Sequence, residues 1–360
     1  RLLPSSRSLF LVTNQMAERH FRGAIADFQT AQVPPTPWQG TAQKVRLPGR
    51  ALWAAGRTLS VMRAFRPHVM VALGGHTCVV PALVGRMLGV KTLLFESNAI
   101  PGRVVRLLAP LADCVVLQWE RAAARLEARR TVVCGNPVRS WLLDVPQQAA
   151  RRRLGLSAQK RTLLATGGSQ GALALNEALY DALGLIQASR LDLQVIHLTG
   201  VVHLGAALEH PVNRSASYRP IGFLERVEEA YAAADFVLSR AGGSTLAYLT
   251  ALGLPSVLIP YPYAAERHQH ANAAVLAEAG AAISIDQSEL TARRLARAIT
   301  ALATRDGLRA QMAERARRLG RPRAAFTVAA ELARMAGFGP QMELSPEDEG
   351  ALANRFPRAA

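Results

Sequence analysis

Short apolar runs rich in Val, Ile and Leu alternate with helical patterns along the whole chain. Ten of these runs predict β-strands, at residues 8–13, 68–73, 91–96, 114–117, 131–134, 161–166, 193–199, 236–239, 256–260 and 282–285. Strands that alternate with helices are typical of parallel sheets with crossover helices. Because ten strands are too many for one small sheet, the pattern predicts an α/β protein with two domains.

The segment 135–160 separates the two halves of this pattern. It has no strand-like run, and it contains Pro137, Pro146 and three successive arginines at 151–153. We therefore expect the domain junction here. The predicted organisation is a first domain at 1–143, a linker at 144–160, a second domain at 161–322, a C-terminal helix at 323–340 and a disordered tail at 341–360.

Charge is distributed unevenly along the 360 residues. Half of the residues are apolar, which excludes an intrinsically disordered chain or a collagen-like fibre. Residues 1–140 contain 19 basic and 6 acidic side chains (+13), whereas residues 141–360 contain 24 and 20 (+4). The first domain is therefore expected to meet an anionic partner. A genome rich in G and C explains the preference for Arg over Lys, but it does not explain this asymmetry.

The cysteines and the apolar stretches exclude several other classes. Cys78, Cys114 and Cys134 are odd in number and lack metal-ligand spacing, so neither a zinc site nor a disulfide framework is expected, and a reducing cytoplasm is the default. The uncharged stretch between residues 66 and 86 has Gly74 and Gly75 at its centre, which indicates a strand, a turn and a helix rather than a membrane span. No signal peptide is predicted.

Two glycine-rich turns follow strands of the second domain. The first is TGGSQGA at 166–172 and the second is RAGGST at 240–245, and each opens a helix. Backbone N–H groups at such a junction favour a phosphate, and two of them in one domain point to one ligand crevice. A glycine turn that binds no ligand is an equally good interpretation of the first motif alone. It is not a Walker A loop, because no Lys follows the glycines.

Further polar segments lie at strand ends. Gln269 and Asn272 are three residues apart, so they share a helical face that either contacts sugar hydroxyls or is simply solvated. In the first domain, the turns at 74–77, 96–102 and 135–139 each follow a strand, at the edge that would line a ligand cleft.

A helical pattern at 46–66 combines apolar residues such as Trp53 and Phe65 with Arg50, Arg57 and Arg63. A core face beside a solvated face is the favoured interpretation. The alternative is a patch in which aromatic side chains enter a bilayer and arginines meet lipid phosphates.

Taken together, these motifs resemble one family. GGHTCVVP, FESNAIPG, GNPVR, TGGSQGA, SRAGGST and HQHANA follow one another over about residues 8–335, in the order found in MurG-type glycosyltransferases of family 28. These enzymes add N-acetylglucosamine (GlcNAc) to undecaprenyl-pyrophosphoryl-MurNAc-pentapeptide in peptidoglycan synthesis. The resemblance implies the GT-B fold, two Rossmann-like doubly wound domains facing across a cleft. The first would bind the lipid acceptor and the second UDP-GlcNAc.

The resemblance also implies an inverting reaction without metal or cofactor, at the cytoplasmic face of the membrane, by a peripheral protein. Its partners would be UDP-GlcNAc, the undecaprenyl-pyrophosphate acceptor and an anionic membrane surface. No nucleic acid is expected as a partner, because no recognised nucleic-acid-binding module is present.

Site residues follow from the same motifs. Ser169 resembles the donor-phosphate ligand, Arg139 a partner of the nucleotide sugar, and Leu224 the residue whose backbone meets uracil. Asn98 and Gln269 would bind GlcNAc. The stretch expected around uridine and ribose is Gly243, Ser244, Thr245, Leu246, Ala247 and Tyr248, and the residues expected to face the acceptor pyrophosphate are Gly74, Gly75, His76 and Thr77.

Two departures from the family are visible. The family has a glycine-rich loop after its first strand, whereas the strand at 8–13 corresponds to the family's second, so we expect that a βα unit of roughly 30–40 residues is missing by truncation. Tyr248 stands where the family has a Glu that accepts both ribose hydroxyls, so donor binding should weaken by roughly 1–3 kcal/mol unless a neighbour compensates.

The catalytic base is not identified by these patterns; His76 and Glu96 are the candidates. Two alternatives to the transferase stay open at this stage. One is a relative that binds nucleotide sugar without turnover, and the other is a diacylglycerol glycosyltransferase of the same fold.

Overall fold

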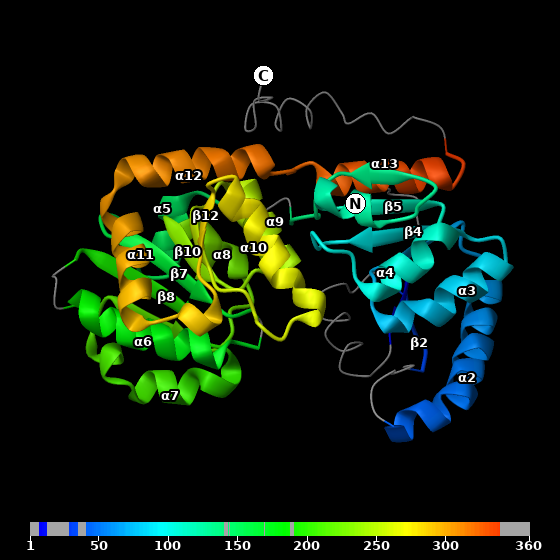
Figure 1. The fold of residues 1–360 in the computed structure, drawn as a ribbon, viewed down its shortest axis with the longest axis horizontal. Helices are drawn as coiled ribbons and strands as arrows, with labels where there is room; N and C mark the ends of the chain where they lie inside the picture. The colour runs from blue at the N-terminus through cyan, green and yellow to red at the C-terminus, as the bar shows by residue number, and fades with distance from the viewer. Residues whose placement is uncertain are drawn as a thin grey trace. The chain divides into compact units, whose positions relative to one another are not determined.

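The computed structural model describes residues 7–12, 29–34, 41–139, 143, 145–168, 170–187 and 191–338. They form two compact units (Figure 1). The first unit comprises Arg1–Glu96, Pro101–Cys134 and Ala325–Ala360, and the second comprises Ser97–Ile100 and Gly135–Ala324. The chain thus enters the second unit briefly after residue 96 and returns to the first unit at its C-terminal helix.

The first unit contains two parallel sheets. β1 (Leu9–Val12) pairs with β2 (Gln29–Gln32), and a separate four-stranded sheet has the order β3-β4-β5-β6. Its strands are β3 (Val69–Ala72), β4 (Lys91–Glu96), β5 (Cys114–Leu117) and β6 (Thr131–Val133). The sequence prediction missed β2, because its Gln-Thr-Ala-Gln sequence has no apolar run.

Helices cover the four-stranded sheet on two faces. α2 (Thr41–Phe65), α3 (Val79–Met87) and α4 (Arg103–Leu108) come before or between its strands, with short 3₁₀ helices at His76–Cys78, Ala109–Leu111 and Glu120–Arg125. Leu94, Val115 and Leu117 meet Val105 and Leu108 in one apolar layer. On the other face, Leu93 and Val116 meet Val328, Leu332 and Met335 of α13 (Ala324–Met335). The C-terminal helix is therefore part of the first unit's core.

The second unit is built on one six-stranded parallel sheet with the order β12-β11-β10-β7-β8-β9. Its strands are β7 (Arg161–Thr166), β8 (Leu193–Leu198), β9 (Tyr218–Ile221), β10 (Phe236–Ser239), β11 (Ser256–Leu258) and β12 (Ala282–Ser284). β9 was not predicted, since its sequence Tyr-Arg-Pro-Ile breaks the apolar run. Proline is tolerated there because β9 is an edge strand.

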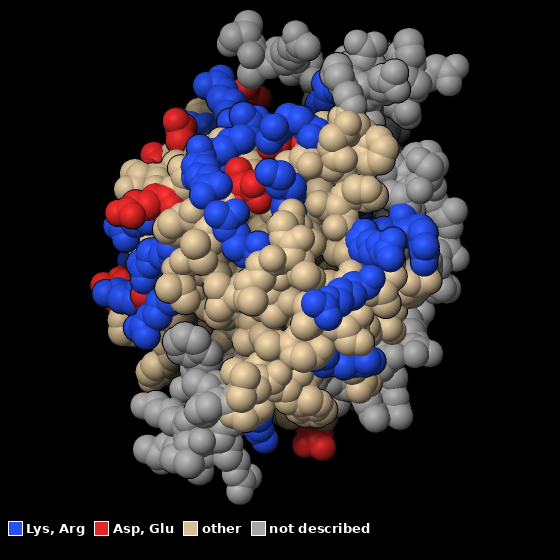
Figure 2. Space-filling view, turned by 90° about the vertical axis from the view of Figure 1, so that its right-hand side faces the viewer, with Lys and Arg blue, Asp and Glu red and all other residues tan. Residues whose placement is uncertain are grey.

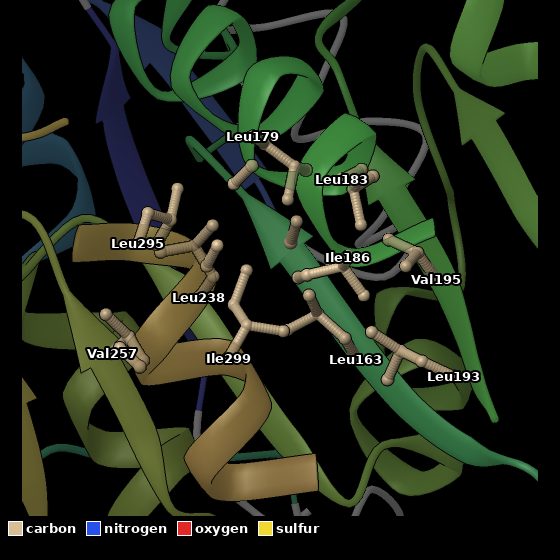
Figure 3. Close-up of a cluster of buried hydrophobic side chains, with 14 of the residues drawn as sticks. Leu163, Leu179, Leu183, Ile186, Leu193, Val195, Leu238, Val257, Leu295 and Ile299 are labelled. Atoms are coloured by element: carbon tan, nitrogen blue, oxygen red, sulfur yellow. The ribbon is translucent and has the colours of Figure 1, made fainter. Parts of the chain in front are cut away.

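Among the helices of this unit, one precedes β7 and the others follow the strands in chain order. They are α5 (Gln147–Arg153), α6 (Leu173–Gln187), α7 (Leu204–Glu209), α8 (Val227–Ala233), α9 (Gly243–Leu252), α10 (His268–Glu278), α11 (Ala292–Thr304) and α12 (Asp306–Leu319). Figure 3 shows Leu179 and Leu183 of α6 and Ile299 of α11 in one apolar layer with strand residues, which are Leu163 of β7, Leu193 and Val195 of β8, Leu238 of β10 and Val257 of β11. This layer fixes the sheet that carries the site.

The predicted linker at 144–160 contains α5, which packs within the second unit. Arg151 Nη2 donates to Asp235 Oδ2 at 2.7 Å, and its Nε donates to the carbonyl of Ala233. Asp235 also accepts from the backbone N–H of Thr162 at the start of β7. The chain therefore joins the second unit at Gly135, before the predicted linker. The predicted tail at 341–360 lies outside the described residues. Among the helices of the described residues, none is long and apolar enough to cross a membrane.

Candidate functional site

The sheet of the second unit changes winding direction between β7 and β10. From β7 the chain proceeds through β8 to β9 on one side, and then returns to β10 on the other side of β7. In open parallel sheets, ligands bind at such a switch point, outside the carboxyl ends of the strands. The turns that flank this point are the two glycine-rich motifs, 166–172 after β7 and 240–245 after β10.

The turn after β7 is packed tightly against the end of β8. Gly171 has φ +74°, and a Cβ there would lie 2.0 Å from the carbonyl oxygen of Thr199. Gly200, with φ +85°, meets the carbonyl of Gln170 in the same way. Only glycine fits either position without strain, because both need a left-handed backbone and close approach. The predicted phosphate ligand Ser169 lies outside the described residues.

A buried network of polar side chains from α6, β8 and β9 lies next to the turn after β7. Asn176 Nδ2 donates to the carbonyl of Thr199 at 3.1 Å, so its Oδ1 is the atom that faces His197 Nε2 at 3.0 Å. His197 Nε2 therefore carries the proton, and Nδ1 accepts from the Tyr218 hydroxyl at 2.7 Å. Burial lowers the pKa of His197 to about 3, so the imidazole is neutral. The sequence prediction missed these residues, because buried polar side chains far apart in the chain leave no local pattern.

The turn after β10 leads directly into α9. Gly242 is the N-cap residue, and no side chain caps the helix. A Cβ on Gly243 would lie 2.7 Å from Ser97, so the segment Ser97–Ile100 lies against the start of α9. Of the predicted uridine and ribose residues, Gly243, Leu246 and Ala247 are buried, Thr245 and Tyr248 are half-buried, and Ser244 is exposed.

Gln269 ties this turn to the next loop. Its Oε1 accepts from the backbone N–H of Ala241 at 3.2 Å and from that of Tyr261 at 2.9 Å. Because both partners are donors, the orientation of the amide is fixed and Nε2 points away from them. Nε2 makes no hydrogen bond with the described part of the chain. Gln269 can therefore bind a ligand by donating a hydrogen bond from Nε2. Its predicted contact with GlcNAc is thereby limited to that of a donor.

Asn272, one helical turn further along α10, joins two other segments. Its Oδ1 accepts from Ala99 N–H at 2.8 Å, and its Nδ2 donates to Asn98 Oδ1 and to the carbonyl of Ala241, both at 3.0 Å. The side chain is fully buried. Asn272 thus holds Asn98 and the turn after β10 close together.

Arg139 lies near Tyr248 of α9. Tyr248 packs beside Val138 and Ala247, with its ring 5.3 Å from that of Tyr231. Burial raises the pKa of the Tyr248 hydroxyl, and the nearby Arg139 opposes that shift. Leu224, in the loop after β9, is half-buried. The phenol at 248 therefore has both a packing role and a polar edge near a guanidinium.

The predicted residues of the first unit lie at the carboxyl ends of β3 and β4. Gly74 has φ +84° and lies against Val105, while Gly75 and His76 are exposed and Thr77 is half-buried. Glu96 is buried, and its Oε2 accepts from the Gly102 N–H at 2.7 Å, which holds the loop before α4. An exposed imidazole is free to meet substrate, whereas the Glu96 carboxylate is engaged by its own loop.

Metal ligands and reactive thiols do not cluster in the described ranges. No group of three or more His, Cys, Asp or Glu side chains that could hold a metal ion occurs within them. Burial raises the pKa of Cys114 to about 12 and that of Cys134 to about 11, so neither thiol is reactive at neutral pH.

Comparison with known proteins identifies the family. Residues 162–328 match the glycosyltransferase family 28 C-terminal domain. The chain is 37% identical to the UDP-N-acetylglucosamine–N-acetylmuramyl-(pentapeptide) pyrophosphoryl-undecaprenol N-acetylglucosamine transferase of Desulforudis audaxviator over 81% of this chain and 79% of that protein. It is 31% identical to the Bacillus subtilis protein of the same name over 79% of this chain and 78% of that protein.

Solved structures agree with this assignment. The crystal structure of Acinetobacter baumannii MurG has 27% sequence identity and a TM-score of 0.70, with 92% of each chain covered. A putative UDP-N-acetylglucosamine 2-epimerase from Listeria monocytogenes, at 16% identity and a TM-score of 0.69, shares the fold. With its two parallel α/β units of GT-B type, the chain belongs to the MurG-type glycosyltransferases of family 28.

Proposed function

We propose that this chain transfers GlcNAc from UDP-GlcNAc to the 4-hydroxyl of MurNAc in undecaprenyl-pyrophosphoryl-MurNAc-pentapeptide, with inversion at the anomeric carbon. The named relatives are transferases for this lipid-linked acceptor. The observation that carries the proposal is the switch point between β7 and β10, flanked by the two glycine turns. This is the location at which an open parallel sheet binds a nucleotide.

Stabilisation of the leaving group is the main chemical task. UDP departs with negative charge on its pyrophosphate, so donors aimed at that charge lower the barrier. No side chain caps the N-terminus of α9, where the helix dipole favours an anion, and Arg139 supplies a positive charge close to Tyr248. We propose that these groups act without metal or cofactor, so that EDTA leaves the rate unchanged.

Sugar recognition is assigned to the α10 side of the turn. In this proposal, Gln269 Nε2 donates to an oxygen of GlcNAc, and Asn98 lies at the same sugar. Gln269 Oε1 and Asn272 hold the backbone of Ala241, so the contact geometry is set before the ligand binds. His76 and Glu96 are retained as candidates for the base, on the acceptor side.

A surface of the first unit supports the peripheral membrane location. Exposed apolar side chains lie on α2 and on, or directly after, α3 and α4, and α3 packs against both α2 and α4. This apolar patch consists of Leu52, Trp53, Leu83, Met87, Leu88, Leu107 and Leu111. Arg50, Arg57, Arg86, Arg103 and Arg106 belong to the same helices. Figure 2, which faces this side, shows Lys and Arg side chains bordering a broad surface with few acidic groups.

The decisive experiment is GlcNAc transfer by the full chain from labelled UDP-GlcNAc to the undecaprenyl-linked acceptor. Gln269→Glu is the informative variant, because glutamate keeps the acceptor for Ala241 and Tyr261 but replaces the Nε2 donor by oxygen. We expect wild-type turnover, and a rate lower by about 10-fold or more in the variant with little change in Tm. Binding of UDP-GlcNAc without transfer would favour the non-catalytic alternative, and transfer only to diacylglycerol would favour the other.

A further inference from the structure

Exposed apolar side chains of the second unit are concentrated at one edge. In the described part of this unit, eight large apolar side chains are exposed, and only Leu185 and Leu208 lie away from the carboxyl ends of the strands. The other six are Leu173, Val201, Val202, Phe223, Tyr261 and Tyr263. Since solvent exposure of apolar surface adds nothing to folding, this concentration at the ligand edge indicates recognition.

Tyr261 and Tyr263 form an aromatic pair in the loop after β11. Their ring centroids are 5.6 Å apart at 72°, an edge-to-face arrangement, and Tyr263 is 80% exposed. Arg240 lies 5.5 Å from the Tyr261 ring centroid. Its guanidinium is held by the carbonyl of Ile259 at 3.1 Å and by Gln287 Oε1 at 2.7 Å. Arg240 is therefore fixed in place beside the Tyr261 ring and restricts its motion, which reduces the conformational entropy lost when a ligand binds.

Gln269 connects this pair to the proposed donor site. The same Oε1 atom accepts from Ala241, at the start of the turn before α9, and from Tyr261. The aromatic pair is therefore next to Gln269, the residue assigned to GlcNAc, because the backbone N–H of Tyr261 donates directly to the Gln269 side chain. During transfer, the acceptor hydroxyl must approach C1 of GlcNAc, so the acceptor's sugar ring lies directly beside the donor sugar.

We propose that the Tyr261–Tyr263 pair is a subsite of the second unit for the sugar ring of the acceptor. This inference rests on the proposed transferase function. A sugar ring has an apolar C–H face and a polar rim, and a tyrosine side chain offers a flat apolar face with a hydroxyl at its edge. Arg240 lies against the Tyr261 ring, and its Nη1 and Nη2 already donate to backbone carbonyls and to Gln287. The pair itself presents ring faces and hydroxyls, which suit a neutral ring better than a pyrophosphate or a peptide carboxylate.

The test separates the acceptor from the donor. Michaelis constants are measured with the full chain for UDP-GlcNAc, for the lipid-linked acceptor, and for the same acceptor without its peptide. Tyr263→Ala is expected to raise the KM of both acceptors by about fivefold, with the KM of UDP-GlcNAc and the Tm unchanged. Tyr263→Phe should retain most of the affinity, because it keeps the ring. Leu208→Ala, at an exposed apolar residue of α7, is the matched control and should change nothing.

Three results would overturn the subsite: unchanged acceptor KM in Tyr263→Ala, a loss confined to the peptide-bearing acceptor, or a loss confined to UDP-GlcNAc. A wild-type chain that fails to transfer GlcNAc at all would instead reject the proposed function. If the wild-type chain transfers GlcNAc and the Tyr263→Ala variant has the same acceptor KM, the subsite is rejected but the proposed function is not.

Discussion

At the scale of single residues, buried polar groups decide how the glycine turn after β7 is held. His197 is fully buried between Asn176 and Tyr218, and burial lowers its pKa to about 3. In the unfolded chain a histidine titrates near pH 6.5. Between these values the unfolded chain binds more protons than the folded one, so folding stability falls as the pH falls from about 6.5 towards 3.

This linkage predicts the behaviour of His197→Gln. A glutamine can still donate to Asn176 and accept from Tyr218, but it does not titrate. We expect the loss of unfolding free energy between pH 7 and pH 5 to be smaller in the variant than in the wild type by about 1–2 kcal/mol. Urea unfolding at both pH values measures it. His68→Gln, at an exposed histidine, is the control, and an equal pH effect in wild type and His197→Gln would contradict the assignment.

The candidate site shows what residue patterns can and cannot predict. The two glycine turns and the position of Gln269 and Asn272 on one helix face can be predicted from local sequence, because turns and helix faces are set by neighbours in the chain. The engagement of Gln269 Oε1 by Ala241 and Tyr261 could not be predicted, since it depends on three segments that only the folded sheet brings together.

At the scale of elements, the junction between β7 and α6 has little tolerance for added atoms. Gly171→Ala places a Cβ 2.0 Å from the Thr199 carbonyl oxygen at a positive φ. We expect a loss of at least about 2 kcal/mol of unfolding free energy together with weaker UDP-GlcNAc binding. Gly184→Ala, within α6 and with nothing near its added Cβ, should instead stabilise the chain by about 0.5–1 kcal/mol. Equal effects of the two variants in thermal unfolding and titration would refute this argument.

α13 is attached to the rest of the first unit by the ion pair between Arg130 and Glu331 as well as by its apolar face, and Glu331 also pairs with Arg334 on α13 itself. Hydrogen bonds from Arg334 and then Arg130 lower the pKa of Glu331 to about 2. The stabilisation is therefore complete above about pH 4.5 and is lost as the pH falls from there towards 2. Both arginines are half-exposed, so solvent screens the pairs.

We expect Glu331→Gln to weaken the docking of α13 by about 1 kcal/mol at neutral pH, seen as faster amide hydrogen exchange in that helix. Glu314→Gln is the matched control, because Glu314 forms an exposed pair with Arg318 one turn away on α12. The interpretation fails if both variants leave the exchange of α13 amides at the wild-type rate.

At the scale of the whole molecule, the sequence predicts two α/β units because strand runs and crossover helices leave a periodic record. The sequence does not predict which segments belong to which unit. Ser97–Ile100 belongs to the second unit although it follows a strand of the first, and α13 returns to the first unit. Such exchanges depend on long-range packing, for example between Val328 and the sheet of the first unit, and a linear pattern does not record them.

The charge asymmetry of the chain leads to the last prediction. The first unit combines basic helices with exposed Trp53 and Met87, so it should bind anionic vesicles through both burial of apolar side chains and attraction of arginines, each basic residue contributing about 1 kcal/mol. Trp53→Glu combined with Met87→Glu removes apolar contact and adds negative charge. We expect this variant to float with anionic vesicles much less than the wild type, and wild-type flotation to decrease in high salt.

Leu185→Glu combined with Leu208→Glu provides the comparison, because this double variant adds the same two negative charges at exposed apolar positions of the second unit. If membrane contact is confined to the first unit, this control should float like the wild type. An equal reduction in both variants would show that net charge alone governs association. Unchanged flotation of the Trp53 and Met87 variant would show that the apolar patch does not contact the membrane. If Trp53 and Met87 were buried in the bilayer, their replacement would reduce the buried apolar area and therefore weaken binding.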